Sequence, residues 1–169
     1  MVKIGLLSDT HGWWDEKYAT HFESCDEIWH AGDIGSTSVA EQLTAIKPLR
    51  AVYGNIDGQE LRLLYPRIAH FSIENVQVMM THIGGYPGHY DPTIRAELYA
   101  AKPTLFIAGH SHILKVMYDK QLKCLHINPG AAGQGGFHQV RTLVRFVIDK
   151  NDIKELEIIE LHKSVRVQL

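Results

Sequence analysis

The stretch Val2-Lys-Ile-Gly-Leu-Leu-Ser-Asp-Thr-His11 places an apolar run directly before two polar residues, Asp9 and His11. A short, nearly continuous apolar run that ends at Ser or Asp predicts a buried β-strand. The same pattern returns along the chain in four further runs: Glu27–His30, Leu49–Tyr53, Val76–Met80 and Thr104–Ala108. These runs are too continuous for half-exposed strands, which favours a sheet that is covered on both faces.

Helical patterns separate several of these runs, over residues 37–46 and 92–101, with Ser36 and Asp91 as expected N-caps. The last third of the chain instead carries consecutive strand-like runs, at Lys115–Tyr118, Lys123–Ile127, Arg141–Ile148 and Ile153–Leu161. Hairpin-type turns lie between the first two and between the last two. We therefore predict an α/β fold in which the last third forms a second, mainly antiparallel sheet packed against the first.

Composition limits the class of protein. The chain has 169 residues, of which 45% are hydrophobic and 21% charged, with a formal net charge of −2. These values predict one compact domain over residues 1–169 and exclude a disordered, collagen-like or coiled-coil chain. The balanced charge gives no reason to expect stable nucleic-acid binding. The chain has two cysteines far apart in sequence, no signal-peptide pattern, and no apolar run of the roughly 18 residues that span a bilayer. We therefore expect a cytoplasmic protein without a membrane segment.

Metal-competent side chains follow five successive predicted strands. They are Asp9 and His11, Asp33, Asn55, His82, and finally His110 and His112. Ligand sites of open α/β sheets form beyond the carboxyl ends of the strands, so these side chains are expected to converge. Asp9 and His11 are two residues apart, which in extended backbone would project them to the same side.

Two carboxylates, one amide and four imidazoles are too many ligands for one ion and suit two ions that share a carboxylate. Nitrogen and oxygen donors of this kind fit Mn²⁺, Fe, Zn, Co or Ni, and disfavour an all-oxygen calcium site or a thiolate zinc site.

Taken in order, the motifs Asp9-Thr-His11, Gly32-Asp33, Gly54-Asn55, His82 and Gly109-His110-Ser-His112 resemble those of the calcineurin-like metallophosphoesterase superfamily. The similarity is to its small bacterial and archaeal phosphodiesterases and runs from Val2 to about Gly130. It implies a four-layer α/β/β/α sandwich of two mixed sheets flanked by helices. It also implies that Asp9, His11 and His112 hold one metal, that Asn55, His82 and His110 hold the other, and that Asp33 bridges them.

The resemblance implies a phosphodiesterase that hydrolyses a small phosphodiester or nucleotide-like substrate through a hydroxide bridging two divalent metals, with Mn²⁺ as the expected ion. Asn55 would also orient a phosphate oxygen. One position departs from the larger members of the superfamily, which carry a histidine directly after the asparagine where this chain has Ile56. Isoleucine cannot protonate a leaving group, so substrates with leaving groups of low pKa are expected.

Other residues are candidates for contacts around such a site. His138 and Arg141, after the glycine-rich stretch 128–136, are candidates for substrate phosphate. His89 and Tyr90 are candidates for the mouth of the pocket, with Tyr86 ranked behind them.

Two further residues have structural interpretations. His30 is expected to pack under Asp33 or to support it, and Asp57 either orients nearby ligands or caps a surface turn. No chemistry is assigned to the remaining histidines, which are His21, His70, His126 and His162.

Other functions remain open at this point. A eukaryotic retromer subunit shares the implied fold and acts as a protein-binding scaffold with an impaired catalytic site, whereas the ligand set of this chain is complete. A nucleotide phosphomonoesterase or a nuclease of the same superfamily is the other alternative, and a nuclease would be expected to have a basic groove. Exposed apolar positions in the C-terminal strands also leave a homo-oligomer open.

Overall fold

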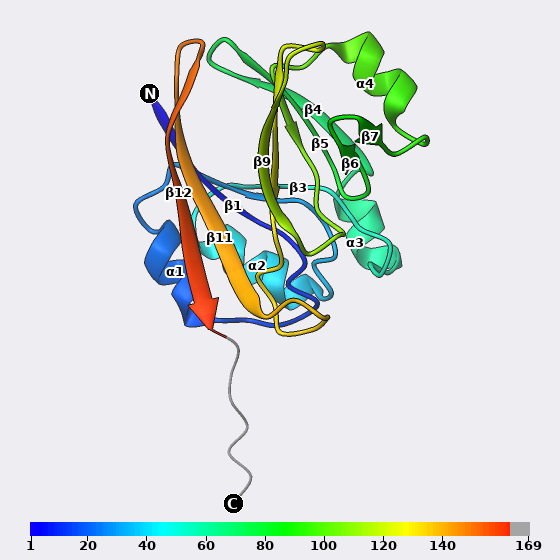
Figure 1. Cartoon of the computed structure of the whole chain (residues 1–169). Coiled ribbons are helices and arrows are strands. Elements are labelled where there is room, and N and C mark those ends of the chain that lie inside the picture. Colours follow the sequence, from blue (N-terminus) through cyan, green and yellow to red (C-terminus); the bar gives the residue numbers. More distant parts are fainter. Residues whose placement is uncertain (163–169) are drawn as a thin grey trace, which may run out of the picture.

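Two five-stranded sheets form the body of the protein (Figure 1). The structure is a computed structural model and describes residues 1–162. The first sheet has the strand order β12-β11-β1-β2-β3 and the second the order β4-β5-β8-β10-β9. Each sheet combines parallel and antiparallel pairs, so the predicted architecture of two packed mixed sheets is confirmed.

The first sheet comprises β1 (Val2–Leu7), β2 (Glu27–His30), β3 (Leu49–Ala51), β11 (Val140–Asp149) and β12 (Asp152–His162). The second sheet comprises β4 (Ile68–Ile73), β5 (Val76–Thr81), β8 (Leu105–Ile107), β9 (Leu114–Asp119) and β10 (Cys124–Pro129). Four helices and a short hairpin complete the described chain: α1 (Glu16–Phe22), α2 (Thr37–Ile46), α3 (Gln59–Leu64), α4 (Arg95–Ala101), β6 (Gly85–Tyr86) and β7 (His89–Tyr90).

The strands that precede the predicted ligands run parallel within their sheets. In the first sheet, β1 pairs in parallel with β2, and β2 with β3. In the second, β8 pairs in parallel with β5 on one side and with β10 on the other. The carboxyl ends of neighbouring strands therefore meet at the same edge of each sheet, as the sequence analysis required.

The last third of the chain does not form a sheet of its own, which corrects the expectation stated above. The hairpin of β9 and β10 extends the second sheet through β8, whereas the hairpin of β11 and β12 extends the first sheet through β1. Pairing of β11 with β1 joins Val2 to Ile148. The apolar pattern of a hairpin predicts its two strands, but it does not show which sheet those strands will join. The strand β4 was not predicted, because its apolar residues alternate with polar ones, as on a half-exposed edge strand, and do not form the nearly continuous apolar run by which the buried strands were predicted.

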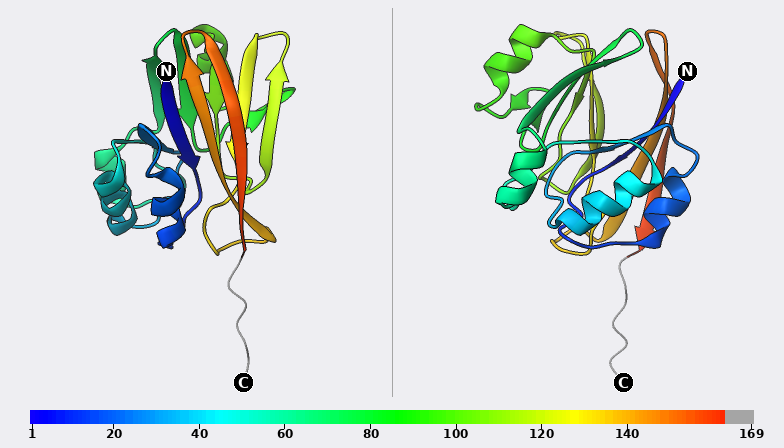
Figure 2. Two further views of the ribbon diagram at one scale, coloured as in Figure 1. Left: turned by 90° about the vertical axis from the view of Figure 1, so that its left-hand side faces the viewer. Right: turned by 180° about the vertical axis from the view of Figure 1, so that it is seen from behind.

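The apolar residues form three layers of core. The largest cluster lies between the two sheets and includes Leu6, Trp29, Met80, Ile107 and Phe146. A second cluster packs α1 and α2 against the outer face of the first sheet, and a third packs α4 against the second sheet. Figure 2 shows α1 and α2 on the side of the first sheet and α4 on the far side of the second. The resulting order of layers is the predicted α/β/β/α sandwich.

One of the two predicted helix caps is confirmed. Ser36 precedes α2 and its hydroxyl accepts from the backbone N–H of Val39. Asp91 instead accepts from Thr93 in a turn before α4, whose N-cap is Ile94. No helix in residues 1–162 has the length and apolar character needed to cross a bilayer.

Candidate metal centre

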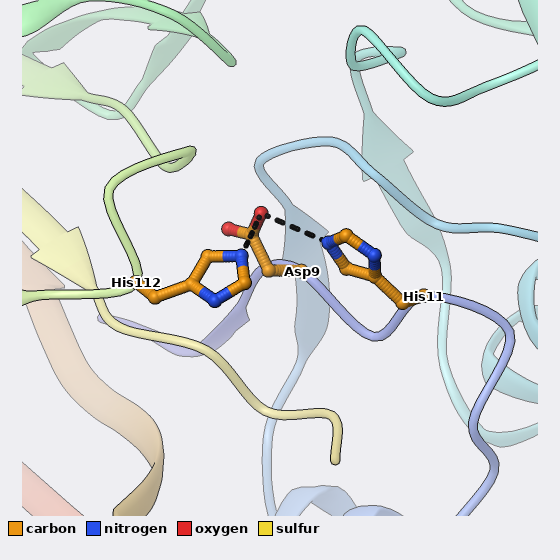
Figure 3. Close-up of side chains that lie close together, drawn as sticks. All are labelled: Asp9, His11 and His112. Carbon is orange, nitrogen blue, oxygen red and sulfur yellow. Dashed lines mark ion pairs between the residues drawn. The ribbon is translucent and has the colours of Figure 1, made fainter. Parts of the chain in front are cut away.

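Three predicted ligands meet where the loop after β1 faces the loop after β8. His112 Nε2 lies 3.2 Å and His11 Nε2 3.6 Å from the same atom, Asp9 Oδ1. Figure 3 shows the two rings approaching the Asp9 carboxylate from different sides. One potential ligand atom from each of these residues lies within 4.8 Å of the others, which is the arrangement that a bound cation requires.

A second group lies beside the first. Asp33, His82 and His110 also offer ligand atoms within 4.8 Å of one another, and His82 Nε2 is 3.0 Å from Asp33 Oδ2. Asn55 belongs to this side, because its Oδ1 lies 3.0 Å from His110 Nδ1. The structure therefore brings all seven predicted metal-site residues together, in two groups.

Asp33 belongs to the second group and also faces the first. Its Oδ2 atom is 3.4 Å from His11 Nε2 in the first group as well as 3.0 Å from His82 Nε2 in the second. Three atoms that face this space, Asp9 Oδ1, His11 Nε2 and His82 Nε2, are buried and make no hydrogen bond within residues 1–162. Buried polar atoms are costly without a partner, and a cation would provide one for all three. The donor set and its orientation thus fit two divalent ions.

The electrostatics of the cluster also favour cations. Burial alone would raise the pKa of Asp9, yet the neighbouring imidazoles of His11 and His112 hold it well below its usual range. The pKa of His11 is raised, chiefly by Asp9, and the pKa of His82 is raised by Asp33 and Asp9 although burial opposes this. Two buried carboxylates therefore create a negative site in which bound cations would take the place of protons.

Hydrogen bonds on the far side of two rings determine which nitrogen faces the site. His82 Nδ1 donates to Ala31 O at 2.8 Å, which leaves the lone pair of Nε2 directed toward Asp33 and Asp9. His112 is held through His138, whose Nε2 donates to Gly133 O at 2.8 Å while its Nδ1 lies 3.2 Å from His112 Nδ1. A neutral His138 then accepts from His112 Nδ1, so His112 also presents a lone pair at Nε2.

Five of the seven ligand candidates have positive φ angles, which are uncommon for residues other than glycine. The angles are +56° at Asp9, +47° at His11, +55° at Asp33, +72° at His110 and +62° at His112. Asp9 and His11 thus reach one site through left-handed turns after β1, and not through the extended alternation on which their convergence was predicted. Unfavourable backbone angles of this kind collect at functional sites and are maintained by the surrounding contacts.

Close packing of loops explains why a glycine precedes Asn55 and another precedes His110. A Cβ atom on Gly54 would collide with the carboxylate and backbone N–H of Asp33, and one on Gly109 would collide with Ser8 Oγ and with Asp9 Oδ2. Only glycine lets these loops approach closely enough to bring the ligands together.

Two buried side chains support the loops that carry the ligands. The Asp57 carboxylate accepts from the backbone N–H groups of Ile34, Gly35 and Gly54, and so joins the Asp33 loop to the Asn55 loop. This favours the ligand-orienting interpretation of Asp57. His30 Nδ1 accepts from Gly32 N, next to Asp33, and burial lowers the pKa of His30 to about 4, so that it remains neutral.

Arg141 is no longer expected to contact substrate. Its side chain is 2% exposed, and its guanidinium pairs with Asp15 at 2.9 Å and donates to Ala132 O at 2.6 Å. It was proposed because it follows a glycine-rich loop, but its direction along β11 turns it toward α1. His138 contacts His112, and a contact with substrate remains a prediction.

The loop of β6 and β7 differs in detail from expectation. Tyr90 is buried and donates to Asp119, whereas Tyr86, which was ranked behind it, lines a cavity of about 200 Å³ together with His110. A second cavity, of about 230 Å³, adjoins Asn55 and His82. Its lining includes Arg62 and Arg67, which the sequence analysis did not single out.

Comparison with known proteins assigns the family. The calcineurin-like phosphoesterase superfamily domain matches residues 2–151. The chain belongs to this superfamily. It is 29% identical over 135 residues to a probable metallophosphoesterase of Methanothermobacter thermautotrophicus, an alignment that covers 76% of each protein.

Solved structures share the fold. A predicted phosphoesterase from Streptococcus pneumoniae superposes with a TM-score of 0.68 and 21% identity, over 98% of this chain and 94% of that one. Wild-type Vps29 from Entamoeba histolytica, solved as a complex with Zn²⁺, superposes with a TM-score of 0.75 and 12% identity, over 95% of this chain and 98% of that one. At these identities the likeness extends to the fold alone.

Proposed function

We propose that this protein is a phosphodiesterase that hydrolyses a small phosphodiester with two divalent transition-metal ions. One ion would be held by Asp9, His11 and His112, and the other by Asn55, His82 and His110. Asp33 would be a ligand of both ions. The proposal rests on three buried atoms, of Asp9, His11 and His82, that make no hydrogen bond within residues 1–162 and face a common space beside Asp33.

The chain's own residues would orient the reaction. When bound, the two ions would lower the pKa of water and offset negative charge on the phosphate. Asn55 is held by His110 through its Oδ1 atom, and its amide nitrogen would donate to a phosphate oxygen. His138 and Ala31 O keep His112 and His82 in the tautomers that can coordinate metal.

The leaving group would receive no proton from the residue after Asn55. Ile56 is 47% exposed and has no ionisable group. We therefore expect the rate of hydrolysis to fall steeply as the pKa of the leaving group rises. The test is kcat/KM for a series of substituted aryl phosphodiesters. A flat dependence with chemistry rate-limiting would contradict this part of the proposal.

Mn²⁺ is the proposed ion, with Fe, Zn, Ni and Co as alternatives. The mixed nitrogen and oxygen donors suit all of them, and affinity alone would favour the later metals of the series. The Vps29 structure that holds Zn²⁺ shows that a protein of this fold can take that metal. Activity and metal content of protein reconstituted with each ion would rank them.

Substitution of the shared ligand tests the two-metal arrangement directly. We expect Asp33→Asn and His82→Ala each to lower bound metal below that of the wild type and to lower hydrolysis of an aryl diester at least about 100-fold. His70→Ala is the matched control, because His70 is exposed on β4 and lies 3.6 Å from a carboxylate oxygen of Glu97 on α4. Full activity in both site variants would refute the mechanism.

The alternative function is that of a protein-binding scaffold. We retain this alternative because the fold is similar to that of Vps29. A scaffold would neither require bound metal nor hydrolyse an activated diester. A nucleotide phosphomonoesterase or nuclease would be distinguished by comparing aryl monoester, aryl diester and single-stranded DNA as substrates.

We also propose a cytoplasmic location and no stable nucleic-acid binding. Size-exclusion chromatography with light scattering would determine whether the chain forms a homo-oligomer.

A further inference from the structure

Two arginines line a cavity next to the candidate metal centre. Arg62, on α3, and Arg67, just before β4, share the lining of a cavity of about 230 Å³ with Asn55 and His82. Cavities that enclose a whole ligand typically measure about 300–1,000 Å³. This one has room for one group of a substrate whose reacting phosphate lies at the metal ligands.

Within residues 1–162, these two guanidinium groups have no acidic partner. Three other arginines in residues 1–162, Arg50, Arg141 and Arg145, form ion pairs at 2.7, 2.9 and 2.6 Å. Within the same part of the chain, neither Arg62 nor Arg67 forms an ion pair. Their positive charge therefore remains uncompensated at the wall of the cavity, in a chain whose formal net charge is −2.

Arg62 is fixed in place without being neutralised. Its Nε donates to Asp57 O at 2.7 Å and its Nη2 to Asn55 O at 3.3 Å. The guanidinium also lies 4.7 Å from the centre of the Tyr53 ring. Because a guanidinium carries five N–H donors, Arg62 keeps donors for a ligand after these contacts. Arg67 makes no side-chain hydrogen bond within residues 1–162, so all its donors are available.

Two further cavities adjoin the metal centre. One, of about 520 Å³, is lined in part by His110, His112 and His138, and its described lining contains no lysine or arginine. The other measures about 200 Å³, and Lys115, the one lysine or arginine of its described lining, places its ammonium 3.5 Å from the centre of the Tyr86 ring. Lys115 likewise forms no ion pair within residues 1–162, but it is a single cation over an aromatic face, whereas two guanidinium groups line the cavity beside Asn55 and His82.

We propose that the cavity of Arg62 and Arg67 binds a second phosphate group of the substrate, next to the phosphodiester that is cleaved. The guanidinium fork matches phosphate oxygens in a bidentate manner, which favours phosphate over a neutral group. This inference rests on the proposed function for the identity of the reacting group. It narrows the substrate class to small diesters that carry an additional phosphate.

The first test compares two substrates that differ in one phosphate. They are the p-nitrophenyl ester of thymidine 5′-phosphate and the same compound with a 3′-phosphate. We expect the wild type to have the higher kcat/KM for the 3′-phosphorylated compound. Arg67→Gln should reduce the ratio of the two kcat/KM values roughly 10-fold or more, as expected for a lost hydrogen bond to a charged group. Arg67 is preferred to Arg62 because Arg62 also holds the backbone of the Asn55 loop.

Arg95→Gln is the matched control. Arg95 also lacks an acidic partner within residues 1–162, but it lies on α4 and donates to Tyr90 O. The Arg95→Gln substitution removes one positive charge, as Arg67→Gln does, but at a position on α4. The ratio of the two kcat/KM values should therefore stay at the wild-type value. A ratio that falls equally in Arg95→Gln and Arg67→Gln would show a general charge effect and overturn the proposal.

The second test measures binding without hydrolysis. In metal-loaded protein, thymidine 3′,5′-bisphosphate should bind more tightly than thymidine 5′-monophosphate, and Arg67→Gln should remove most of the difference. Inorganic phosphate, titrated alone, should bind more weakly than the bisphosphate. Equal binding of the two nucleotides by the wild type would overturn the phosphate subsite even if both aryl esters are hydrolysed. Tighter bisphosphate binding with no hydrolysis of either ester would reject the proposed function and support the subsite.

Discussion

His138 is the residue whose loss should weaken one group of metal ligands more than the other. It connects Gly133 O to His112 Nδ1, and so orients the ring that faces Asp9. We expect His138→Ala to lower the affinity for one of the two metal ions roughly 10–100-fold, the usual effect of removing a partner that orients a ligating histidine. Competition with a chromogenic chelator would measure both affinities independently of catalysis.

The conservative variant distinguishes orientation from simple loss of packing. Gln at position 138 can accept from His112 and donate to Gly133 O, so His138→Gln should recover part of the lost affinity. His89→Ala, which removes an exposed histidine packed on the Tyr86 ring, should leave both affinities unchanged. Equal loss in the alanine and glutamine variants would contradict the orienting role.

At this scale the sequence predicts ligands better than it predicts their neighbours. Asp33 and His82 could be found because each follows a predicted buried strand and has a side chain that binds metals. Arg62 and Arg67 could not, because an arginine beside a cavity and an arginine on an open surface look alike in the sequence. Their significance depends on the absence of an acidic partner in the described part of the chain, which only the folded arrangement shows.

The two loops after β2 and β3 depend on a single carboxylate. Asp57 is buried and accepts from three backbone N–H groups, at Ile34, Gly35 and Gly54. Removal of this acceptor would leave buried donors without partners, and we expect Asp57→Ala to lower the free energy of unfolding by about 3 kcal/mol. Urea denaturation of the metal-free protein would measure the change.

An exposed aspartate provides the comparison. Asp26 also accepts from a backbone N–H, that of Lys3, but at an exposed position. Asp26→Ala should cost less than about 1 kcal/mol, because water replaces the lost acceptor. A similar cost for both variants would mean that burial of the Asp57 hydrogen bonds contributes little.

Elements were predictable individually, whereas their partners were not. The run Val2–Leu7 and the hairpin of β11 and β12 were each expected as strands, but nothing in their apolar patterns shows that Val2 pairs with Ile148. The ligand-bearing loops were expected at strand ends, and they are there. Their left-handed backbone was not expected, because Asp9 and His11 adopt it through tertiary contacts that oppose their local preference.

Stability of the whole molecule should depend on pH through its buried neutral histidines. Burial lowers the pKa of His126 to about 4, and its Nε2 makes no hydrogen bond within residues 1–162. The unfolded chain, with a histidine pKa near 6.5, takes up this proton first. The contribution of His126 to stability is therefore complete above about pH 6.5 and is lost as the pH falls toward 4.

Replacement by leucine should remove this dependence. Between pH 7 and pH 5 the wild type should lose about 2 kcal/mol more of its free energy of unfolding than His126→Leu does. Urea denaturation of the metal-free proteins at both pH values would measure the difference, and contributions of the other histidines cancel in the comparison. His70→Leu, at an exposed position, should behave like the wild type. An identical pH dependence in His126→Leu would refute the assignment.

The pairing of β1 with β11 also has a consequence for how the protein is made. Strand β1 lies between β2 and β11, and its antiparallel partner, which includes residues 144–148, is synthesised well after it. At roughly 5–20 residues per second, many seconds of translation separate these two segments. The edge of β1 that pairs with β11 therefore has no partner in the sheet until residues 144–148 have been synthesised. Formation of this sheet should be slow, because a contact between residues as distant in sequence as Val2 and Ile148 has a high entropic cost of closure.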